Sequence, residues 1–170
     1  MDTFEAVRTL LAVRNFQTKP VPAESLRRIL EAGRLTGSSM NGQPWHFIVI
    51  QERATLHQLG ALLRSGPYVA QAPLAIVVAT TNTPYAVSDA SRAIQSMLLT
   101  AWTDGLGSNW VGFSGGLDNL KPLLGVPAKV DILAVLPFGY PQDVVAGQGK
   151  KKRKALAEIV HRERWGQSLE

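Results

Sequence analysis

Apolar residues recur along this chain at two spacings, one typical of helices and one typical of strands. Where they return every three or four residues, one face of a helix is apolar and can pack on a core. Capping residues and turn formers separate these segments, so the pattern also indicates where each helix begins and ends. The predicted helices run from a cap at Thr3 to about Arg14, from Pro22 to Gly37, over Thr55–Leu63 and Tyr68–Gln71, from Ser88 to about Asp104, and over Leu117–Leu124.

Four runs with strand character stand between these helices. Leu74–Thr80 is continuously apolar and rich in β-branched residues, which is typical of a strand buried on both faces. Strands separated by helices indicate an α/β or α+β sheet covered by helices. The other predicted strands are His46–Ile50, Asn109–Phe113 and Val130–Leu136.

The composition narrows the class of protein. The chain has 170 residues, of which 45% are hydrophobic and 18% charged, and this fits one domain over residues 1–170. The absence of cysteine excludes disulfides, thiolate metal sites and a cysteine nucleophile. The longest apolar runs, such as Leu74–Ala79, are far shorter than the roughly 20 residues of a membrane span, and no signal peptide is visible. We therefore expect a soluble cytoplasmic protein without a membrane partner.

The net charge of +5 comes from one short segment. Five consecutive basic residues occupy positions 150–154, and without them the acidic and basic residues balance. Because the basicity is local, we expect no nucleic-acid-binding face. The basic run itself fits a solvated tail, a patch for nucleic acid or another anion, or a clamp for the phosphate of a small ligand.

The C-terminal tail, Gly139–Glu170, shows no strand pattern and only a short helical one over Ala155–Val160. It is too polar to form a domain, yet Ile159 and Trp165 are apolar and favour burial. A tail with scattered apolar residues is typical of a segment that wraps a partner subunit. We therefore expect a dimer.

Two familiar kinds of site do not fit the sequence. Gly105-Leu106-Gly107-Ser108-Asn109-Trp110 begins like a dinucleotide-binding fingerprint, but it ends in Trp and its glycines follow a helix. A helix C-terminus is the simpler interpretation. His46, His57 and His161 have no ligand spacing between them, so we expect no metal site.

A serine hydrolase is an alternative that the sequence leaves open. Gly112-Phe113-Ser114-Gly115-Gly116 matches the G-x-S-x-G nucleophile motif and follows a predicted strand, and Asp131, Asp143 and His161 come later in the usual order. Against this reading, two glycines follow Ser114, the chain is short for that fold, and no glycine-rich oxyanion loop lies upstream. Glycines that let the backbone approach a ligand closely explain the segment equally well.

The stretch Ser38–Trp45 concentrates uncharged hydrogen-bonding groups between a helix and a strand. Two hydroxyls, an Asn and a Gln within six residues fit ordinary turn chemistry. They equally fit the edge of a flat heteroaromatic ring with alternating carbonyls and ring nitrogens, which fixed amides recognise well. Both interpretations stay open on the pattern alone.

Five segments, in order along the chain, together resemble one protein family. Ser38–Phe47 carries the signature S-S-x-N-x-Q-P-W-x-F. The other four are Arg14-Asn15-Phe16 with Pro20-Val21-Pro22, Gly105–Gly112, Leu136–Pro141, and Lys151–Lys154 with Glu158, Val160 and His161. In this combination they resemble the FMN-dependent nitroreductase family.

The resemblance implies an α+β fold, with a central mixed β-sheet flanked by helices, in a homodimer whose extended C-terminal tail wraps the partner subunit. It implies two FMN sites at the subunit interface. NADH or NADPH would reduce the flavin, and a nitroaromatic, quinone or enone-type acceptor would then take electrons from the same face by a ping-pong mechanism. We expect no catalytic side chain, because the flavin carries the chemistry.

The resemblance also assigns cofactor-binding residues by position. Arg14, Lys151 and Arg153 would meet the FMN phosphate, which a guanidinium fork suits. The loop residues would line the ribityl chain and the ring, and a glycine-rich segment would present backbone N–H groups to the ring. These two sets are Ser38, Ser39, Met40, Asn41 and Gln43, and Gly112, Phe113, Ser114 and Gly115.

One departure from the family pattern affects the phosphate site. Leu10-Leu11-Ala12 stands where the family usually has R-R-S, and Arg8, about one helical turn earlier, would replace part of the lost charge. Weak FMN binding, a deazaflavin in place of FMN, and a non-catalytic dimer that stores or senses flavin are all consistent with this change. The chain is also short for the family, which implies a more open flavin face.

Overall fold

A four-stranded antiparallel sheet forms the centre of the fold, in the order β1-β2-β4-β3. The computed structural model describes residues 1–112, 116–143 and 151–169. β2 pairs with β1 on one side and with β4 on the other, and a shift in register between Val78 and Ala79 interrupts the second pairing. The strands are β1 (Trp45–Ile50), β2 (Leu74–Thr81), β3 (Gly107–Ser108) and β4 (Val130–Gly139).

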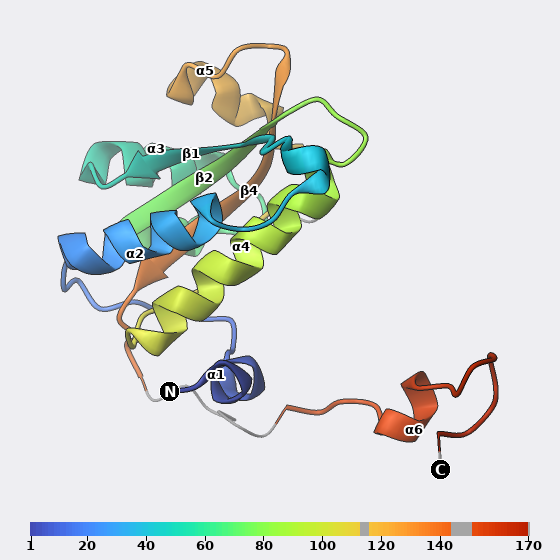
Figure 1. Cartoon of the computed structure of the whole chain (residues 1–170). Helices are drawn as coiled ribbons and strands as arrows, with labels where there is room; N and C mark the ends of the chain where they lie inside the picture. The colour runs from blue at the N-terminus through green and yellow to red at the C-terminus, as the bar shows by residue number, and fades with distance from the viewer. Residues whose placement is uncertain (113–115, 144–150, 170) are drawn as a thin grey trace.

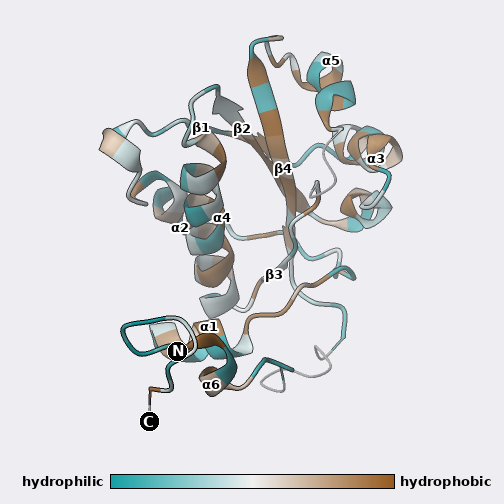
Figure 2. Cartoon of the chain, turned by 90° about the vertical axis from the view of Figure 1, so that its right-hand side faces the viewer, coloured by the Kyte–Doolittle hydropathy of each residue, from teal (hydrophilic) through white to brown (hydrophobic). Residues whose placement is uncertain are grey.

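Helices cover both faces of this sheet. α2 and α4 lie on one side of it, and α3 and α5 lie on the other (Figures 1 and 2). The helices are α1 (Thr3–Thr9), α2 (Ala23–Arg34), α3 (Arg53–Leu62), α4 (Ala86–Thr103), α5 (Lys121–Leu124) and α6 (Leu156–Ile159), with short 3₁₀ helices η1 (Ser39–Asn41), η2 (Pro67–Gln71) and η3 (Asp118–Leu120).

Alternation along β2 explains why its sequence is apolar throughout. Ile76 and Val78 pack toward α2 and α4 in one core cluster, whereas Ala75 and Val77 join a second cluster with α3. Successive strand residues point to opposite faces, so a strand covered on both sides needs apolar residues at every position. The predicted α+β class is confirmed. The pairs between named strands are antiparallel, and within the described residues parallel pairing occurs at a bridge between Ala12 and Ser108.

The first helix is shorter than predicted. Asp2, not Thr3, caps it by accepting a hydrogen bond from the Glu5 N–H at 2.8 Å, and the helix ends at Thr9 instead of Arg14. Thr9 is fixed from both sides, since its hydroxyl donates to the Glu5 carbonyl at 2.7 Å and accepts from Trp102 Nε1 at 2.9 Å. The chain then turns into an extended segment. The predicted continuation of this helix from Thr9 to Arg14 is therefore wrong.

The predicted strand Asn109–Phe113 is wrong. The residues that pair with β4 are Gly107 and Ser108, while Val111 forms a single bridge to Val135. Gly112 follows with a φ of 121°, a backbone conformation that favours glycine. Phe113 lies outside the described residues.

The other predicted elements are present with small shifts at their ends. The second helix ends at Arg34, before the predicted Gly37, and Pro22 occupies its N-cap position. The long helix begins at Ala86, two residues before the predicted start, and it buries Ala90, Ile94, Met97, Leu98 and Ala101 as its pattern indicated. Gly105 then adopts a φ of 77°, so the predicted helix C-terminus at this glycine is confirmed.

The C-terminal tail extends away from the sheet and its helices (Figure 1). Its predicted helical turn is present as α6. Leu156, Ile159 and Trp165 are 67%, 58% and 90% exposed, so the described chain leaves the apolar side chains of the tail uncovered. Within the described residues, none of the helices has the length and apolar character needed to cross a bilayer.

Candidate functional site

The loop that joins α2 to β1 has an uncommon backbone. Met40, Asn41 and Gln43 have φ values of 51°, 54° and 44°, in the left-handed region that residues other than glycine rarely adopt. Three such residues within four positions persist only where the surrounding structure fixes them. All three side chains are exposed, and Met40 is 87% exposed. The loop therefore offers its polar groups to a ligand or to another chain.

Asp89, near the start of α4, holds this loop in place through hydrogen bonds with Ser39. Its carboxylate is 1% exposed and accepts hydrogen bonds from the Ser39 N–H at 3.1 Å and from the Ser39 hydroxyl at 3.0 Å. Arg92 forms an ion pair with the same carboxylate. Burial alone would raise the pKa of the Asp89 carboxyl, but the hydrogen bonds from Ser39 and the Arg92 charge outweigh it, so the pKa lies below its ordinary value. Asp89 is therefore ionised at neutral pH.

Two further hydrogen bonds close the loop on itself. The Gln43 N–H donates to Ser38 Oγ at 2.9 Å, and Gln43 Nε2 donates to the Asn41 carbonyl at 3.2 Å. The structure thus brings together the five loop residues that the sequence assigned to the flavin.

A second group of predicted residues gathers at a cleft beside α1. The cleft has a volume of about 490 Å³, and Arg8, Lys151 and Arg153 line it together with Gln95 of α4 and the apolar Phe4, Val7 and Leu10. Arg8 forms an ion pair with Glu5 at 2.7 Å, and Lys151 Nζ donates to the Val7 carbonyl at 2.7 Å. Arg8 thus lines the cleft from two positions before Leu10.

The charges in this cleft favour an anion. Burial lowers the pKa of the Lys151 ammonium, and the positive charge of Arg153 lowers it further. An anion bound between them would offset that repulsion, and guanidinium and ammonium groups are the ordinary partners of phosphate. The cleft therefore fits a phosphate group.

Arg14 does not line this cleft in the structure. It lies exposed in the extended segment after α1. Its neighbours hold that segment, because the Val13 N–H donates to the Ser108 carbonyl at 2.9 Å and Phe16 forms a bridge to Pro141. The assignment of Arg14 to the phosphate stays a prediction.

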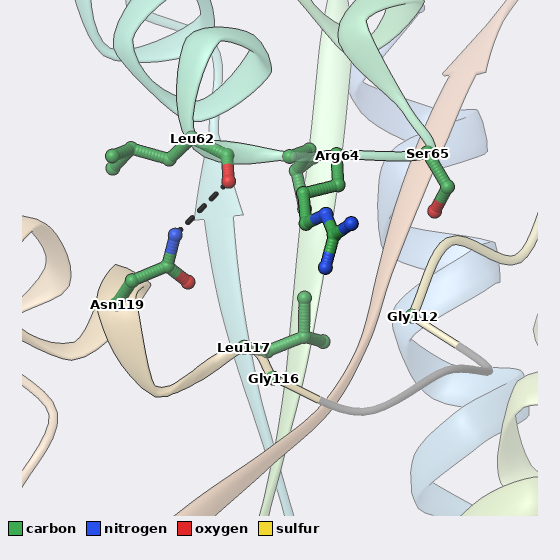
Figure 3. A pocket seen from close by; sticks show the side chains of 8 residues that line it. Leu62, Arg64, Ser65, Gly112, Gly116, Leu117 and Asn119 are labelled. Atoms are coloured by element: carbon green, nitrogen blue, oxygen red, sulfur yellow. Dashed lines mark hydrogen bonds between the residues drawn. The ribbon is translucent and has the colours of Figure 1, made fainter.

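Gly112 lies at a third place, where a pocket of about 530 Å³ opens between the end of α3 and η3 (Figure 3). Leu117 packs tightly under it, since a Cβ at position 112 would lie 2.7 Å from Leu117 Cδ1. Phe113, Ser114 and Gly115, which the sequence assigned to the flavin ring together with Gly112, lie outside the described residues.

The loop lies near the start of α4, α1 lies near its other end (Figure 1), and the cleft beside α1 reaches the middle of α4 at Gln95. Asp89, under the loop, and Gln95, which lines the cleft, are six residues apart on that helix, which is roughly 9 Å along its axis and on a different face. The structure thus brings the five loop residues together and places Arg8, Lys151 and Arg153 at one cleft without Arg14, and it separates the loop from that cleft within one chain.

The sequence reasoning missed three residues at these places: Asp89, Gln95 and Arg64. Asp89 carried a signal that could have been found, because an acidic residue stands on the apolar face of α4 beside Ala90 and Ala93. A buried acid is usually paired or hydrogen-bonded, and besides Arg92, three residues later, Asp89 has a partner from a distant segment in Ser39. Gln95 and Arg64 carried no such signal.

The arrangement needed for a serine hydrolase is not assembled within the described part of one chain. Asp131, at the start of β4, lies 3.8 Å from Lys121, and His161 stacks against Trp165 in the tail. These elements lie at opposite ends of the molecule (Figure 1). Ser114 itself lies outside the described residues.

Comparison with known proteins decides the family. The model of the nitroreductase family matches residues 11–83 and 64–140. The chain belongs to the nitroreductase family. The predicted resemblance is confirmed, and with it the predicted enzyme class, an oxidoreductase of the nitroreductase type.

Relatives of this nitroreductase-family chain cover most of its length. A protein of Methanothermobacter thermautotrophicus, named "Putative NADH dehydrogenase/NAD(P)H nitroreductase", is 33% identical over 151 residues, which is 84% of this chain and 79% of the relative. An FMN reductase [NAD(P)H] of Bacillus subtilis is 27% identical over 89% of this chain and 70% of its own length. The solved structure of an FMN-dependent nitroreductase from Clostridium difficile superposes with a TM-score of 0.82 at 26% identity, covering 95% of this chain and 99% of that one.

Proposed function

We propose that this protein is an FMN-dependent oxidoreductase that takes electrons from NADH or NADPH and passes them to a nitroaromatic, quinone or enone-type acceptor by a ping-pong mechanism. The observation that carries the proposal is the cationic cleft of Arg8, Lys151 and Arg153. The names of the FMN-dependent relatives support the cofactor assignment.

The cleft would hold the phosphate of FMN. The Arg8 guanidinium presents several N–H donors in a fixed plane, and its ion pair with Glu5 holds it in place. Lys151 is anchored on the Val7 carbonyl and adds a second charge. Because all these groups are partly exposed, the attraction weakens with salt.

The loop with the left-handed residues would meet the ribityl chain and the ring. Asn41 and Gln43 offer amide donors and acceptors, and Ser39 is held by Asp89, so the loop needs no reorganisation on binding. Rigid polar groups of this kind bind a ligand with a smaller entropic cost than mobile ones.

A second copy of the chain would complete the site. The loop and the cleft meet α4 on different faces, and the tail presents Leu156, Ile159 and Trp165 uncovered. We propose a homodimer in which the tail packs on the partner subunit, as its apolar side chains require.

Sedimentation should show a dimer that dissociates more readily in an Ile159→Glu variant. Val49, an exposed residue of β1, supplies the control as Val49→Lys. A monomeric wild-type protein would contradict the dimer.

Bound FMN supplies a two-electron carrier that connects donor and acceptor. The side chains of this chain bind and orient, and none of them is assigned a proton-transfer role. Positive charge and backbone donors near the ring would favour the electron-rich form of the cofactor. Donor and acceptor would use the same open face in turn, which is the basis of the ping-pong proposal.

The first experiment is an absorption spectrum of the purified protein, with mass spectrometry of whatever it releases on denaturation. Released FMN, followed by parallel double-reciprocal lines for NADH or NADPH against an acceptor, is the expected result. A colourless protein that takes up no added FMN would contradict the proposal.

A non-catalytic dimer that binds flavin or a deazaflavin is the second candidate. The observation that favours it is Leu10, an uncharged side chain that lines the cationic cleft in the segment where the family usually has R-R-S. Full flavin occupancy without oxidation of NADH or NADPH would favour this candidate, and a released deazaflavin would identify the cofactor.

A further inference from the structure

We propose that the pocket beside Gly112 binds an anionic group of a redox substrate through Arg64. The inference rests on the proposed function, because it places this pocket next to the residue that the family resemblance assigns to the flavin ring. The anionic group is a carboxylate or a phosphate, borne by the acceptor or by the electron donor.

Close contacts fix two sides of this pocket. Gly66 packs so tightly on Val111 that a Cβ at position 66 would lie 2.5 Å from Val111 Cγ1, which holds the segment after α3 against the residues that precede Gly112. On the opposite side, Asn119 Nδ2 donates to the Leu62 carbonyl at 3.0 Å and joins η3 to the end of α3. The pocket therefore has a preformed shape, as ligand sites usually do.

Arg64 is the cation of this pocket. Its side chain extends from the connection between α3 and η2 into the space above Leu117, with Ser65 at its side (Figure 3). Within the described part of the chain, Arg64 has no hydrogen bond or ion pair, and no acidic residue lines the pocket. A guanidinium with its donors unused and no neighbouring carboxylate is suited to an anionic oxygen group.

The rest of the lining indicates what carries that anion. Leu62, Leu63 and Leu117 present apolar surface, while Ser65 and Asn119 add neutral polar groups. Such a lining fits a flat apolar body that bears one charged substituent, for example an aromatic acid. Arg64 would then determine specificity by selecting among substrates of similar shape, with no part in electron transfer.

The test compares a carboxylate with a neutral molecule of the same shape. For wild-type protein loaded with FMN, we expect kcat/KM for 4-nitrobenzoate to exceed that for 4-nitrobenzamide by about tenfold, since the pair is charge-assisted but exposed. Arg64→Met should abolish this preference by raising KM at unchanged kcat. Arg64→Lys should keep part of it, because the charge remains without the planar fork. Arg27→Met, which removes an exposed arginine on α2, is the control.

A second arm identifies the source of the anion. If the 2′-phosphate of NADPH occupies the pocket, Arg64→Met should raise KM for NADPH but not for NADH, and the ratio between the two nitro compounds should stay unchanged. Calorimetry with benzoate, which is not reduced, measures binding without turnover, and its affinity should fall about tenfold in Arg64→Met.

The outcomes separate this inference from the proposed function. Reduction of 4-nitrobenzamide by NADH involves neither tested anion, so its failure in the wild type would contradict the proposed function alone. If that reaction proceeds while Arg64→Met changes neither the acceptor ratio, nor the donor ratio, nor benzoate binding, the Arg64 subsite is wrong. Circular dichroism and thermal melting of each variant show that it is folded.

Discussion

The Ser39 backbone N–H and hydroxyl both donate to the buried carboxylate of Asp89, fifty residues later in the chain. This pair joins the start of the long helix α4 to the loop in which Met40, Asn41 and Gln43 hold left-handed backbone conformations. The carboxylate also pairs with Arg92, so its charge is balanced within its own helix. Asp89 therefore positions the loop and leaves the exposed side chains free to bind.

Replacing Asp89 should loosen the loop and weaken flavin binding. Asp89→Asn keeps one acceptor oxygen but removes the negative charge that accepts from Ser39 and pairs with Arg92. We therefore expect roughly a tenfold rise in the dissociation constant for FMN. Titration of apoprotein with FMN, followed by flavin fluorescence, measures it. Asp118→Asn, at an exposed surface pair with Lys121, is the matched control and should change little. Equal affinities in the two variants would contradict the positioning role.

The same contact predicts a pH dependence. The pKa of the Asp89 carboxyl is lower in the folded protein than in the unfolded chain, where it is about 3.9. The ionised group therefore contributes its full stabilisation above that value, and the contribution is lost as the pH falls through the lower folded pKa. We expect the urea midpoint of the wild type to show this loss at acidic pH. The difference in midpoint between wild type and Asp89→Asn should be constant from about pH 6 to 8 and should shrink below about pH 4. A difference that grows toward low pH would contradict the assignment.

The cationic cleft should recognise the phosphate of FMN and not its ring. Arg8→Gln or Arg153→Gln should weaken FMN binding by about tenfold and leave the affinity for riboflavin, which lacks the phosphate, unchanged. The FMN affinity of the wild type should also fall with added salt, more steeply than that of either variant. Arg34→Gln provides a close control, because Arg34 pairs with Glu31 at 2.7 Å in the same spacing as Arg8 with Glu5. If riboflavin and FMN lose affinity equally, the phosphate assignment is wrong.

Gly66 should be intolerant of any side chain. The buried Val111 cannot turn away easily, because a β-branched side chain has few allowed rotamers. Gly66→Ala should therefore destabilise the protein by about 1–3 kcal/mol in urea unfolding. Gly37→Ala is the control, since a Cβ there meets nothing within 4 Å. Adding Val111→Ala to Gly66→Ala should recover part of the overpacking cost in a double-mutant cycle, and strict additivity would show that the two residues are not coupled.

The local pattern of apolar and polar residues was sufficient to predict much of the fold and part of the candidate site. The apolar stripe of α4 and the continuous run of β2 correctly predicted a helix and a strand covered on both faces. The short loop around Ser39 was found as a concentrated set of polar residues, and its members do lie together because they are neighbours in sequence. Arg8, Lys151 and Arg153 were grouped only through the family resemblance, since 143 positions separate Arg8 from Lys151.

Where the prediction was wrong, a contact from a distant element decided the outcome. The helical spacing after Thr9 continues in the sequence, yet Trp102 holds the Thr9 hydroxyl and Val13 bonds to Ser108, so the chain leaves the helix. The segment 109–113 has strand propensity, but the continuous pairing with β4 lies at Gly107 and Ser108, and Val111 adds a single bridge to Val135.

By itself, then, the sequence determined which segments are helices or strands, which loop is chemically distinct, and, through its ordered motifs, the family. These properties depend on neighbours within a few residues, where spacing and propensity act directly. Only the tertiary structure revealed that Asp89 holds Ser39, that Arg64 enters the pocket beside Gly112, and that loop and cleft meet α4 on different faces. Those relationships depend on the packing of elements far apart in the chain, for which no local pattern contains the information.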